Sequence, residues 1–143
     1  MLLYFACRAQ NVDEWITPAL SRDEIVLSDR FTDSTLVYQG CGRGLGAETV
    51  LTLDRIACRG LKPDLTLLID IDLETSLARA EARNLRGNRT DRMEQQAADF
   101  YEKVRDAYLA LAASEPDRFR IIDGRAGVDV VHGELWKVVK ARV

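Results

Sequence analysis

Leu65-Thr66-Leu67-Leu68-Ile69-Asp70 is the stretch that decides the fold class of this chain of 143 residues. It is apolar almost throughout, and it lies between a turn signal at Lys62-Pro63-Asp64 and a helical pattern over residues 73–84. A short, continuous apolar run of this kind predicts a parallel strand that is covered on both faces. A similar run at Ile25–Ser28 and the stretch Arg118–Asp123 predict two more strands.

Helical patterns separate these predicted strands. The first predicted helix covers residues 2–20 and carries an apolar face at helical spacing. That face consists of Leu2, Phe5, Ala9, Val12, Ile16 and Leu20. The other predicted helices cover residues 33–40, 47–59, 73–84, 93–113 and 128–143. Strands that alternate with helices indicate an α/β protein with a parallel sheet, and the length fits a single domain over 1–143.

Composition narrows the class of protein. A hydrophobic fraction of 47% and a charged fraction of 30% indicate a soluble globular chain without a membrane-spanning run. The net charge of −3 argues against a nucleic-acid binder, which would carry a basic face. Three scattered cysteines and a single histidine predict free thiols in a reducing cytoplasm rather than a zinc site.

The predicted strands end in carboxylates, and ligands of open α/β sheets bind at that edge. These carboxylates are Asp29, Asp70 with Asp72, and Asp123. Asp29-Arg30 is the most suggestive pair, because an arginine at a strand end can direct two donors onto a phosphate. The alternative is a structural ion pair or a solvated turn.

A series of arginines follows the predicted strand at residues 65–70. Arg79 and Arg83 share one face of the helix over 73–84, and Arg86, Arg89 and Arg92 lie in a polar stretch beyond it. Several guanidinium groups together suit the distributed negative charge of a phosphoryl group in transfer. The alternative is a solvated helix with salt bridges to neighbouring carboxylates.

The glycine-rich stretch Gly40-Cys41-Gly42-Arg43-Gly44-Leu45-Gly46 is not a phosphate-binding loop. Such a loop ends in Gly-Lys followed by Ser or Thr, between a strand and a helix. No Gly-Lys pair occurs in these 143 residues. We interpret the stretch as a helix terminator and turn.

These features occur in an order that resembles the bacterial thymidylate kinases. The resemblance covers essentially the whole chain, and several motifs in sequence are more specific than any one of them. It rests on Tyr4–Gln10, Asp29-Arg30-Phe31, Asp33–Gly40 followed by Gly42-Arg43-Gly44, Leu61–Asp70, Arg89 with Asp91-Arg92 and Glu94, and Phe100–Leu109.

The resemblance implies a P-loop-kinase-like, three-layer parallel sheet and a transferase that phosphorylates dTMP to dTDP with ATP and Mg²⁺, a step of nucleotide biosynthesis. It implies that Arg8 and Arg30 hold the dTMP phosphate and that Tyr4 stacks on thymine. The base and sugar pocket would be lined by Ser34, Thr35, Tyr38 and Gln39. The implied catalytic residues are Asp29, Arg30, Arg89 and Arg92.

The resemblance also implies a lid at about residues 83–94 and a cytoplasmic homodimer. The lid arginines that would reach the ATP phosphates are Arg83, Arg86, Arg89 and Arg92. The helices over 2–20 and 47–59 are the candidate dimer faces. No protein metal site, nucleic-acid partner or membrane partner is implied.

The chain departs from the family pattern because the phosphate-binding loop and the first two strands of the family fold are absent. We therefore expect an N-terminally truncated member that transfers phosphate poorly or not at all by itself. We also expect the strands at 25–28 and 65–70, deprived of their shared neighbour, to pair directly or through another chain.

Two alternatives stay open at this point. The first is a related nucleoside monophosphate or deoxynucleoside kinase, which a substrate panel would separate from a dTMP kinase. The second is a non-catalytic remnant that binds nucleotide or dimerises. Binding of dTMP without turnover would favour the remnant.

Overall fold

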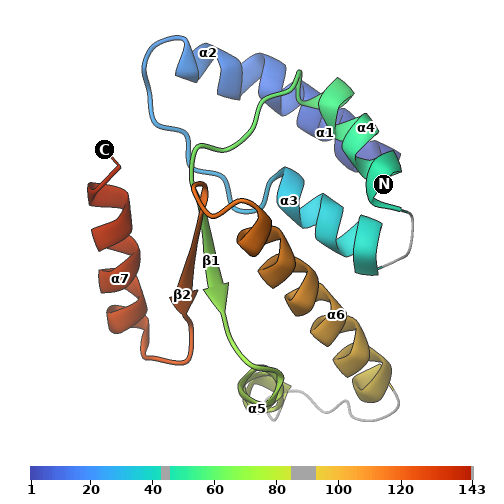
Figure 1. The fold of residues 1–143 in the computed structure, drawn as a ribbon, viewed down its shortest axis with the longest axis vertical. Helices are drawn as coiled ribbons and strands as arrows, with labels where there is room; N and C mark the ends of the chain where they lie inside the picture. Colours follow the sequence, from blue (N-terminus) through green and yellow to red (C-terminus); the bar gives the residue numbers. More distant parts are fainter. Residues whose placement is uncertain (43–45, 85–92, 143) are drawn as a thin grey trace. The chain divides into compact units, whose positions relative to one another are not determined.

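The computed structural model describes residues 1–42, 46–84 and 93–142. These residues form two compact units (Figure 1), an N-terminal unit, Met1–Lys62, and a C-terminal unit, Pro63–Val143. The N-terminal unit is helical, whereas the C-terminal unit contains a parallel sheet. The single domain over 1–143 stays a prediction.

The N-terminal unit opens with three contiguous helical segments, as the periodicity over residues 2–20 predicted. They are the α-helix α1 (Leu2–Asn11), the π-helix η1 (Val12–Ile16) and the α-helix α2 (Thr17–Leu20). Pro18 lies at the start of α2 and has no N–H with which to continue the hydrogen-bond ladder. The wider π turn directly before it accommodates that interruption.

Two further helical stretches complete this unit. The α-helix α3 (Thr32–Thr35) continues into the π-helix η2 (Leu36–Gly42), which runs past the predicted end at residue 40. The α-helix α4 (Ala47–Ala57) follows, close to the predicted 47–59. Gly46 precedes α4 with φ of 85°, a left-handed conformation that glycine adopts without steric cost.

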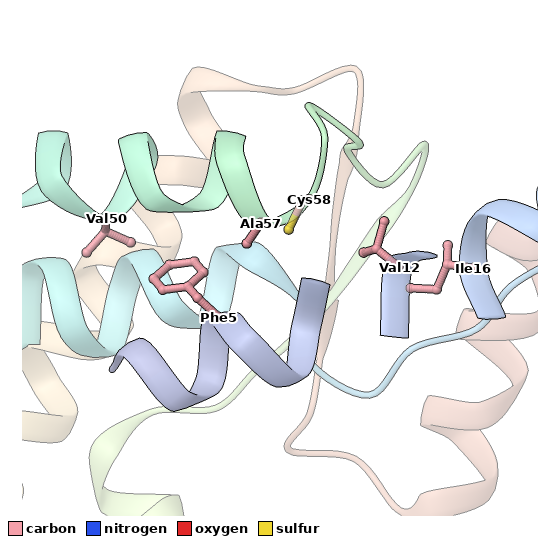
Figure 2. Close-up of a cluster of buried hydrophobic side chains, with 6 residues drawn as sticks. All are labelled: Phe5, Val12, Ile16, Val50, Ala57 and Cys58. Carbon is pink, nitrogen blue, oxygen red and sulfur yellow. The ribbon is translucent and has the colours of Figure 1, made fainter. Parts of the chain in front are cut away.

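The apolar faces of α1, η1 and α4 form the core of the N-terminal unit (Figure 2). The cluster consists of Phe5, Val12, Ile16, Val50, Ala57 and Cys58. Figure 2 shows the Phe5 ring between α1 and α4, with Val50 and Ala57 directed toward it from α4. Full burial of each large apolar side chain here stabilises the fold by about 1.5–3 kcal/mol.

The strand predicted at Ile25–Ser28 is wrong. Residues 24–28 have no regular secondary structure, and Ile25 and Leu27 are 74% and 92% exposed. A strand exists only where a neighbour accepts and donates its backbone hydrogen bonds, and no described residue pairs with this segment. The direct pairing expected between 25–28 and 65–70 is therefore not found, and pairing through another chain stays a prediction.

The sheet of the C-terminal unit contains β1 (Thr66–Asp70) and β2 (Phe119–Asp123). The two strands are parallel, with Thr66 opposite Phe119 and Asp70 opposite Asp123. Their carboxyl ends therefore meet at one edge. The pairing confirms the predicted α/β class, the parallel arrangement and two of the three predicted strands.

Three helices accompany this sheet. They are α5 (Leu73–Asn84), α6 (Met93–Ser114) and α7 (Val128–Lys140), and all three were predicted from periodicity. Among the described side chains of the unit, the buried apolar ones are Val104, Ala112, Phe119 and Ile122. Among the described residues, no helix has the length and apolar character needed to cross a membrane.

Candidate functional site

Arg8 lies in α1 and has the most unusual environment among the residues singled out by sequence. Its side chain is only 14% exposed. The guanidinium carbon lies 5.7 Å from the centre of the Phe5 ring and 5.4 Å from that of Phe31, within cation–π range. Its Nη1 is buried and has no hydrogen-bond partner among the described residues. A buried cationic donor of this kind is suited to an anionic ligand.

Among the described residues, Asp54 of α4 forms an ion pair with Arg8. The distance from Arg8 Nη1 to Asp54 Oδ1 is 3.9 Å, which is an ion pair but too long for a hydrogen bond. Burial raises the pKa of Asp54, while the thiol of Cys58 and the charge of Arg8 oppose that rise. Cys58 donates its S–H to Asp54 Oδ1 at 3.3 Å. Burial, followed by the nearby Asp54, raises the pKa of Cys58 to about 12, so the thiol stays protonated.

The Asp29-Arg30-Phe31 motif contacts Arg8 through the ring of Phe31. Asp29 and Arg30 are exposed, and Arg30 has φ of 65°, an uncommon value for a residue with a side chain. The Arg30 guanidinium lies 5.1 Å from the centre of the Tyr38 ring. Since Phe31 lies against Arg8, the structure joins three segments that are separate in sequence: α1, the motif and η2.

The remaining acceptor-side residues fall on α1, α3 and η2. Tyr4 is 65% exposed on α1. Ser34, Tyr38 and Gln39 are half-buried. Thr35 is only 4% exposed, so its side chain lies in the interior of the unit. Tyr38 and Gln39 lie in a π-helix, a conformation that is often found at functional sites.

The predicted lid falls largely outside the described residues. Arg86, Arg89 and Arg92 belong to the stretch 85–92, which the structure does not describe. Arg83 lies in the last turn of α5, but its side chain is not among those described. The roles of these four arginines remain predictions.

The carboxylate at the end of β1 is occupied by a structural pair. Arg105 of α6 donates from Nε and Nη2 to the two oxygens of Asp70, at 2.7 and 2.8 Å. Asp72 accepts from the backbone N–H and the hydroxyl of Thr75, at 2.7 and 2.9 Å, at the start of α5. These hydrogen bonds lower the pKa of Asp72. Asp70 therefore joins β1 to α6, whereas Asp72 caps the start of α5.

Arg79 and Asp123 have structural partners as well. Arg79 donates to the carbonyl oxygens of Gly124 and Arg125, at 2.9 and 3.1 Å. The hydrogen bonds from Arg125 lower the pKa of Asp123 to about 2. Arg79 therefore links α5 to the loop after β2 through its two hydrogen bonds.

An open pocket of about 570 Å³ lies beside α5 and is lined by Asp72, Glu74, Thr75, Ala78 and Arg79.

Sequence reasoning found Arg8 but missed Asp54 and Cys58. The i, i+4 spacing of these two residues at the end of the predicted helix over 47–59 was the available signal. That spacing shows that they share a face, but it does not show that the face meets Arg8. The three cysteines, Cys7, Cys41 and Cys58, all lie among the described residues and are free.

Comparison with known proteins identifies the family of this chain. The family model for thymidylate kinase matches residues 1–135. A thymidylate kinase of Pelobacter propionicus is 51% identical over 145 residues, which cover 100% of this chain and 64% of that protein. Those of Geotalea uraniireducens and Geobacter sulfurreducens are 48% and 46% identical, again over all of this chain and 68% of each relative. The chain therefore spans about two thirds of the length of these relatives.

Proposed function

The chain belongs to the thymidylate kinase family, and from that premise we propose that its function is the phosphorylation of dTMP to dTDP with ATP as donor. The family implies a P-loop nucleoside monophosphate kinase fold, and the parallel pair β1–β2 with its flanking helices agrees with that class. The chain supplies the acceptor side of the reaction from its N-terminal unit.

The environment of Arg8 is the observation that carries this proposal. Its guanidinium carbon lies 5.7 Å from the centre of the Phe5 ring and 5.4 Å from that of Phe31, and its buried Nη1 has no hydrogen-bond partner among the described residues. Such a cation binds a doubly charged phosphate more strongly than a solvated arginine would, because little water has to be displaced from it. Arg30 is exposed and has a left-handed backbone conformation. It provides a second cation from the Asp29-Arg30-Phe31 motif.

Each side chain of the acceptor site then has a distinct task. Arg8 and Arg30 bind and orient the dTMP phosphate, so that one of its oxygens is in line with the γ-phosphorus of ATP. Tyr4, exposed on α1, stacks on the thymine ring. Ser34, Tyr38 and Gln39 of α3 and η2 define the base and sugar pocket. The role there of Thr35, which is buried in the interior of the unit, remains a prediction.

The metal ion belongs to the donor substrate. Among the described residues, no group of three His, Cys, Asp or Glu side chains could hold a metal ion. Mg²⁺ in phosphoryl-transfer sites is held by one or two carboxylates together with the substrate phosphates. Asp29 is exposed and directly follows residues 24–28, and it could supply one such carboxylate. Mg²⁺ would enter with ATP and neutralise charge on the transferring group.

The donor side rests on the lid arginines Arg83, Arg86, Arg89 and Arg92. We assign them to the ATP phosphates because guanidinium groups stabilise the charge that spreads over a transferring phosphoryl group. No Gly-Lys pair occurs in these 143 residues, so they contain no phosphate-loop lysine. We therefore expect these residues by themselves to bind dTMP and to turn it over slowly or not at all.

The same family premise supports a homodimer in the cytoplasm. Large apolar side chains are exposed on the two helices singled out by sequence, with Leu2 and Leu3 at 68% and 81% on α1 and Ile56 at 63% on α4. Burial of these side chains against a second copy would remove them from water. Light scattering coupled to size-exclusion chromatography checks the assembly, and a monomer at all concentrations would contradict it.

The decisive experiment is calorimetric titration of the purified chain with dTMP, then thymidine, then ATP–Mg²⁺, beside a coupled kinase assay. Binding of dTMP that is much tighter than binding of thymidine supports the proposal, because only the phosphate distinguishes the two ligands. A panel of dTMP, dUMP, dCMP and dGMP separates a dTMP kinase from related kinases. Binding of none of these ligands by a folded chain would overturn the proposal.

A non-catalytic role is the second candidate. Its support is the same absence of a Gly-Lys pair from the 143 residues. In that case the chain binds dTMP without turnover, even when a large excess of ATP–Mg²⁺ is present. The calorimetric and kinetic arms of the experiment together distinguish the two roles.

A further inference from the structure

We propose that Tyr38 is a positioning residue, whose ring restrains the exposed guanidinium of Arg30 before the phosphate of a nucleoside monophosphate arrives. The inference rests on the proposed function, because it takes Arg30 as a residue that binds that phosphate. The pocket assigned to Tyr38 above concerns the base and the sugar. Its contact with Arg30 adds a second role, which the motifs of the sequence did not indicate.

The first step is the backbone at Arg30. Its φ of 65° lies in the left-handed region, which residues with a side chain seldom adopt. The hydroxyl of Ser28 donates to the carbonyl oxygen of Arg30 at 3.2 Å. On the other side, the centre of the Phe31 ring lies 5.4 Å from the guanidinium carbon of Arg8. Contacts on both sides of Arg30 therefore hold the uncommon backbone conformation from which its side chain extends.

The second step is the ring that this side chain meets. The guanidinium carbon of Arg30 lies 5.1 Å from the centre of the Tyr38 ring, which is within cation–π range. Tyr38 is half-buried, and the residue directly before it, Val37, is only 1% exposed. The helical stretch that carries the ring is thus anchored in the interior of the N-terminal unit. A long and flexible arginine side chain consequently lies against an anchored ring.

The third step is the state of the Arg30 donors. Arg30 is an exposed residue, so a ligand in solution has access to it. Within the described ranges, its guanidinium has no hydrogen-bond acceptor and no carboxylate partner. A cation–π contact engages the face of a guanidinium, while its N–H groups lie in the plane and suit the oxygens of a phosphate. A restrained cation of this kind loses less conformational entropy on binding an anion than a freely rotating one does.

Calorimetry on the intact 143-residue chain tests the inference with two substitutions, Tyr38→Leu and Tyr38→Phe. The quantity compared is the ratio of dTMP affinity to thymidine affinity, because only the phosphate distinguishes the two ligands. A lost contact to base or sugar affects both ligands alike and cancels in this ratio. We expect Tyr38→Leu to lower the ratio by about fivefold. Tyr38→Phe should preserve the ratio, because it preserves the ring.

Two further variants are controls for this measurement. In an Arg30→Ala background, Tyr38→Leu should leave the ratio where Arg30→Ala alone sets it, because Tyr38 acts through Arg30. Tyr4→Leu removes another tyrosine of the same unit, and it should lower both affinities without changing their ratio. An unchanged ratio in a folded Tyr38→Leu chain would overturn the inference. An equal loss in Tyr38→Phe would overturn it as well, since the ring would then not be the cause.

A second measurement separates this inference from the proposed function. NMR relaxation of the Arg30 Nε–Hε group in the ligand-free chain reports directly whether the guanidinium is held. We expect a restrained group in the wild type and in Tyr38→Phe, and a clearly more mobile one in Tyr38→Leu, or in Tyr38→Met if the leucine variant does not fold. Arg59, which donates to Asp13 at 2.8 Å, is the internal reference and should not change.

The NMR and calorimetric results together identify which statement fails. Equal mobility of Arg30 in the wild type and in the variant without a ring defeats the positioning role, whether or not dTMP binds. Failure of the wild type to bind dTMP, with Arg30 restrained by Tyr38, defeats the proposed function and the phosphate as the ligand, while the restraint itself stands.

Discussion

The two units of the chain hold their arginines in opposite ways. In the N-terminal unit, Arg8 and Arg30 lie over aromatic rings, and Nη1 of Arg8 has no hydrogen-bond partner among the described residues. In the C-terminal unit, Arg79 and Arg105 donate to backbone carbonyls and to a carboxylate at 2.7–3.1 Å. Arg8 thus keeps a donor without a hydrogen bond, whereas the hydrogen bonds of Arg79 and Arg105 hold elements of the fold together.

This difference shows why an arginine cannot be assigned from sequence spacing alone. Arg79 begins the arginine series that suggested phosphate binding, yet its donors are satisfied by the loop after β2. Arg8 lies in an ordinary amphipathic helix, yet its Nη1 is buried without a hydrogen-bond partner among the described residues. The number and kind of groups around a guanidinium decide whether it stabilises the fold or binds an anion.

The largest effect is expected from Arg8→Ala. We expect dTMP affinity to fall by more than about a hundredfold, roughly 3 kcal/mol, because a desolvated charge that contacts the phosphate is lost. Calorimetry measures the loss, and Arg59→Ala, which removes an exposed arginine of the same unit, is the matched control. An Arg8→Ala chain that keeps wild-type dTMP affinity would show that Arg8 is as structural as Arg105.

A second substitution tests how closely the side chains around Gly124 are packed in the C-terminal unit. A Cβ at Gly124 would lie 2.6 Å from Ile71 Cγ2 and 2.7 Å from Ile69 Cγ2. We expect Gly124→Ala to destabilise the unit by about 1–3 kcal/mol, because packed side chains must move. Gly133→Ala is the control: a Cβ there meets nothing within 4 Å inside α7, so a gain of up to about 1 kcal/mol is expected. Urea denaturation reads both, and equal stabilities would contradict the packing.

Arg105→Ala tests the structural pair directly. Asp70 would lose both hydrogen bonds of its bidentate partner. The Arg105 and Asp70 side chains are 39% and 21% exposed, so solvent screening limits the expected loss of stability to about 1 kcal/mol. Hydrogen exchange should quicken in β1 and α6, while dTMP affinity stays unchanged. A fall in dTMP affinity without faster exchange would assign Arg105 to the ligand.

The smallest effect concerns pH, where the two units should respond with opposite sign. Burial raises the pKa of Asp54, so the native state binds that proton more tightly than the unfolded state, and its contribution to stability decreases as pH rises through the raised pKa. Arg125 lowers the pKa of Asp123 to about 2 from 3.8. The Asp123 contribution is therefore present above the unfolded value and is lost as pH falls toward 2.

Hydrogen exchange of the two units between neutral and acidic pH measures this difference. We expect Asp123→Asn to remove part of the acid sensitivity of the C-terminal unit and Asp54→Asn to make the N-terminal unit less sensitive to rising pH. The same sign of response in both variants would refute the opposed titrations.

Local patterns predicted most of the fold. The periodicity over residues 73–84 matches α5 residue for residue, and α6 and α7 begin where it placed them. The apolar run at 65–70 became β1, because β2 lies beside it in parallel register. The run at 25–28 has the same character and formed no strand. Apolar composition alone therefore did not distinguish the two segments.

The sequence likewise predicted only some of the residues of the candidate site. Its motif residues, such as Arg8 and Arg30, were identified from their order along the chain. The contact of the Phe31 ring with Arg8, the carboxylate of Asp54 and the thiol of Cys58 were not, because they come from two segments, the motif and the end of α4, that are distant from Arg8 along the chain. The lid residues 85–92 lie outside the described residues, so their part of the site remains a prediction.

By itself, the sequence determined the helices, the α/β class and the family, because helical periodicity and motif order are properties of consecutive residues. The fold in three dimensions was needed to show which apolar run pairs as a strand, which arginines donate to carbonyls and carboxylates, and which one has a buried donor without a hydrogen-bond partner among the described residues. These outcomes depend on backbone pairing, desolvation and charge, and each of them is set by groups that lie far away along the chain.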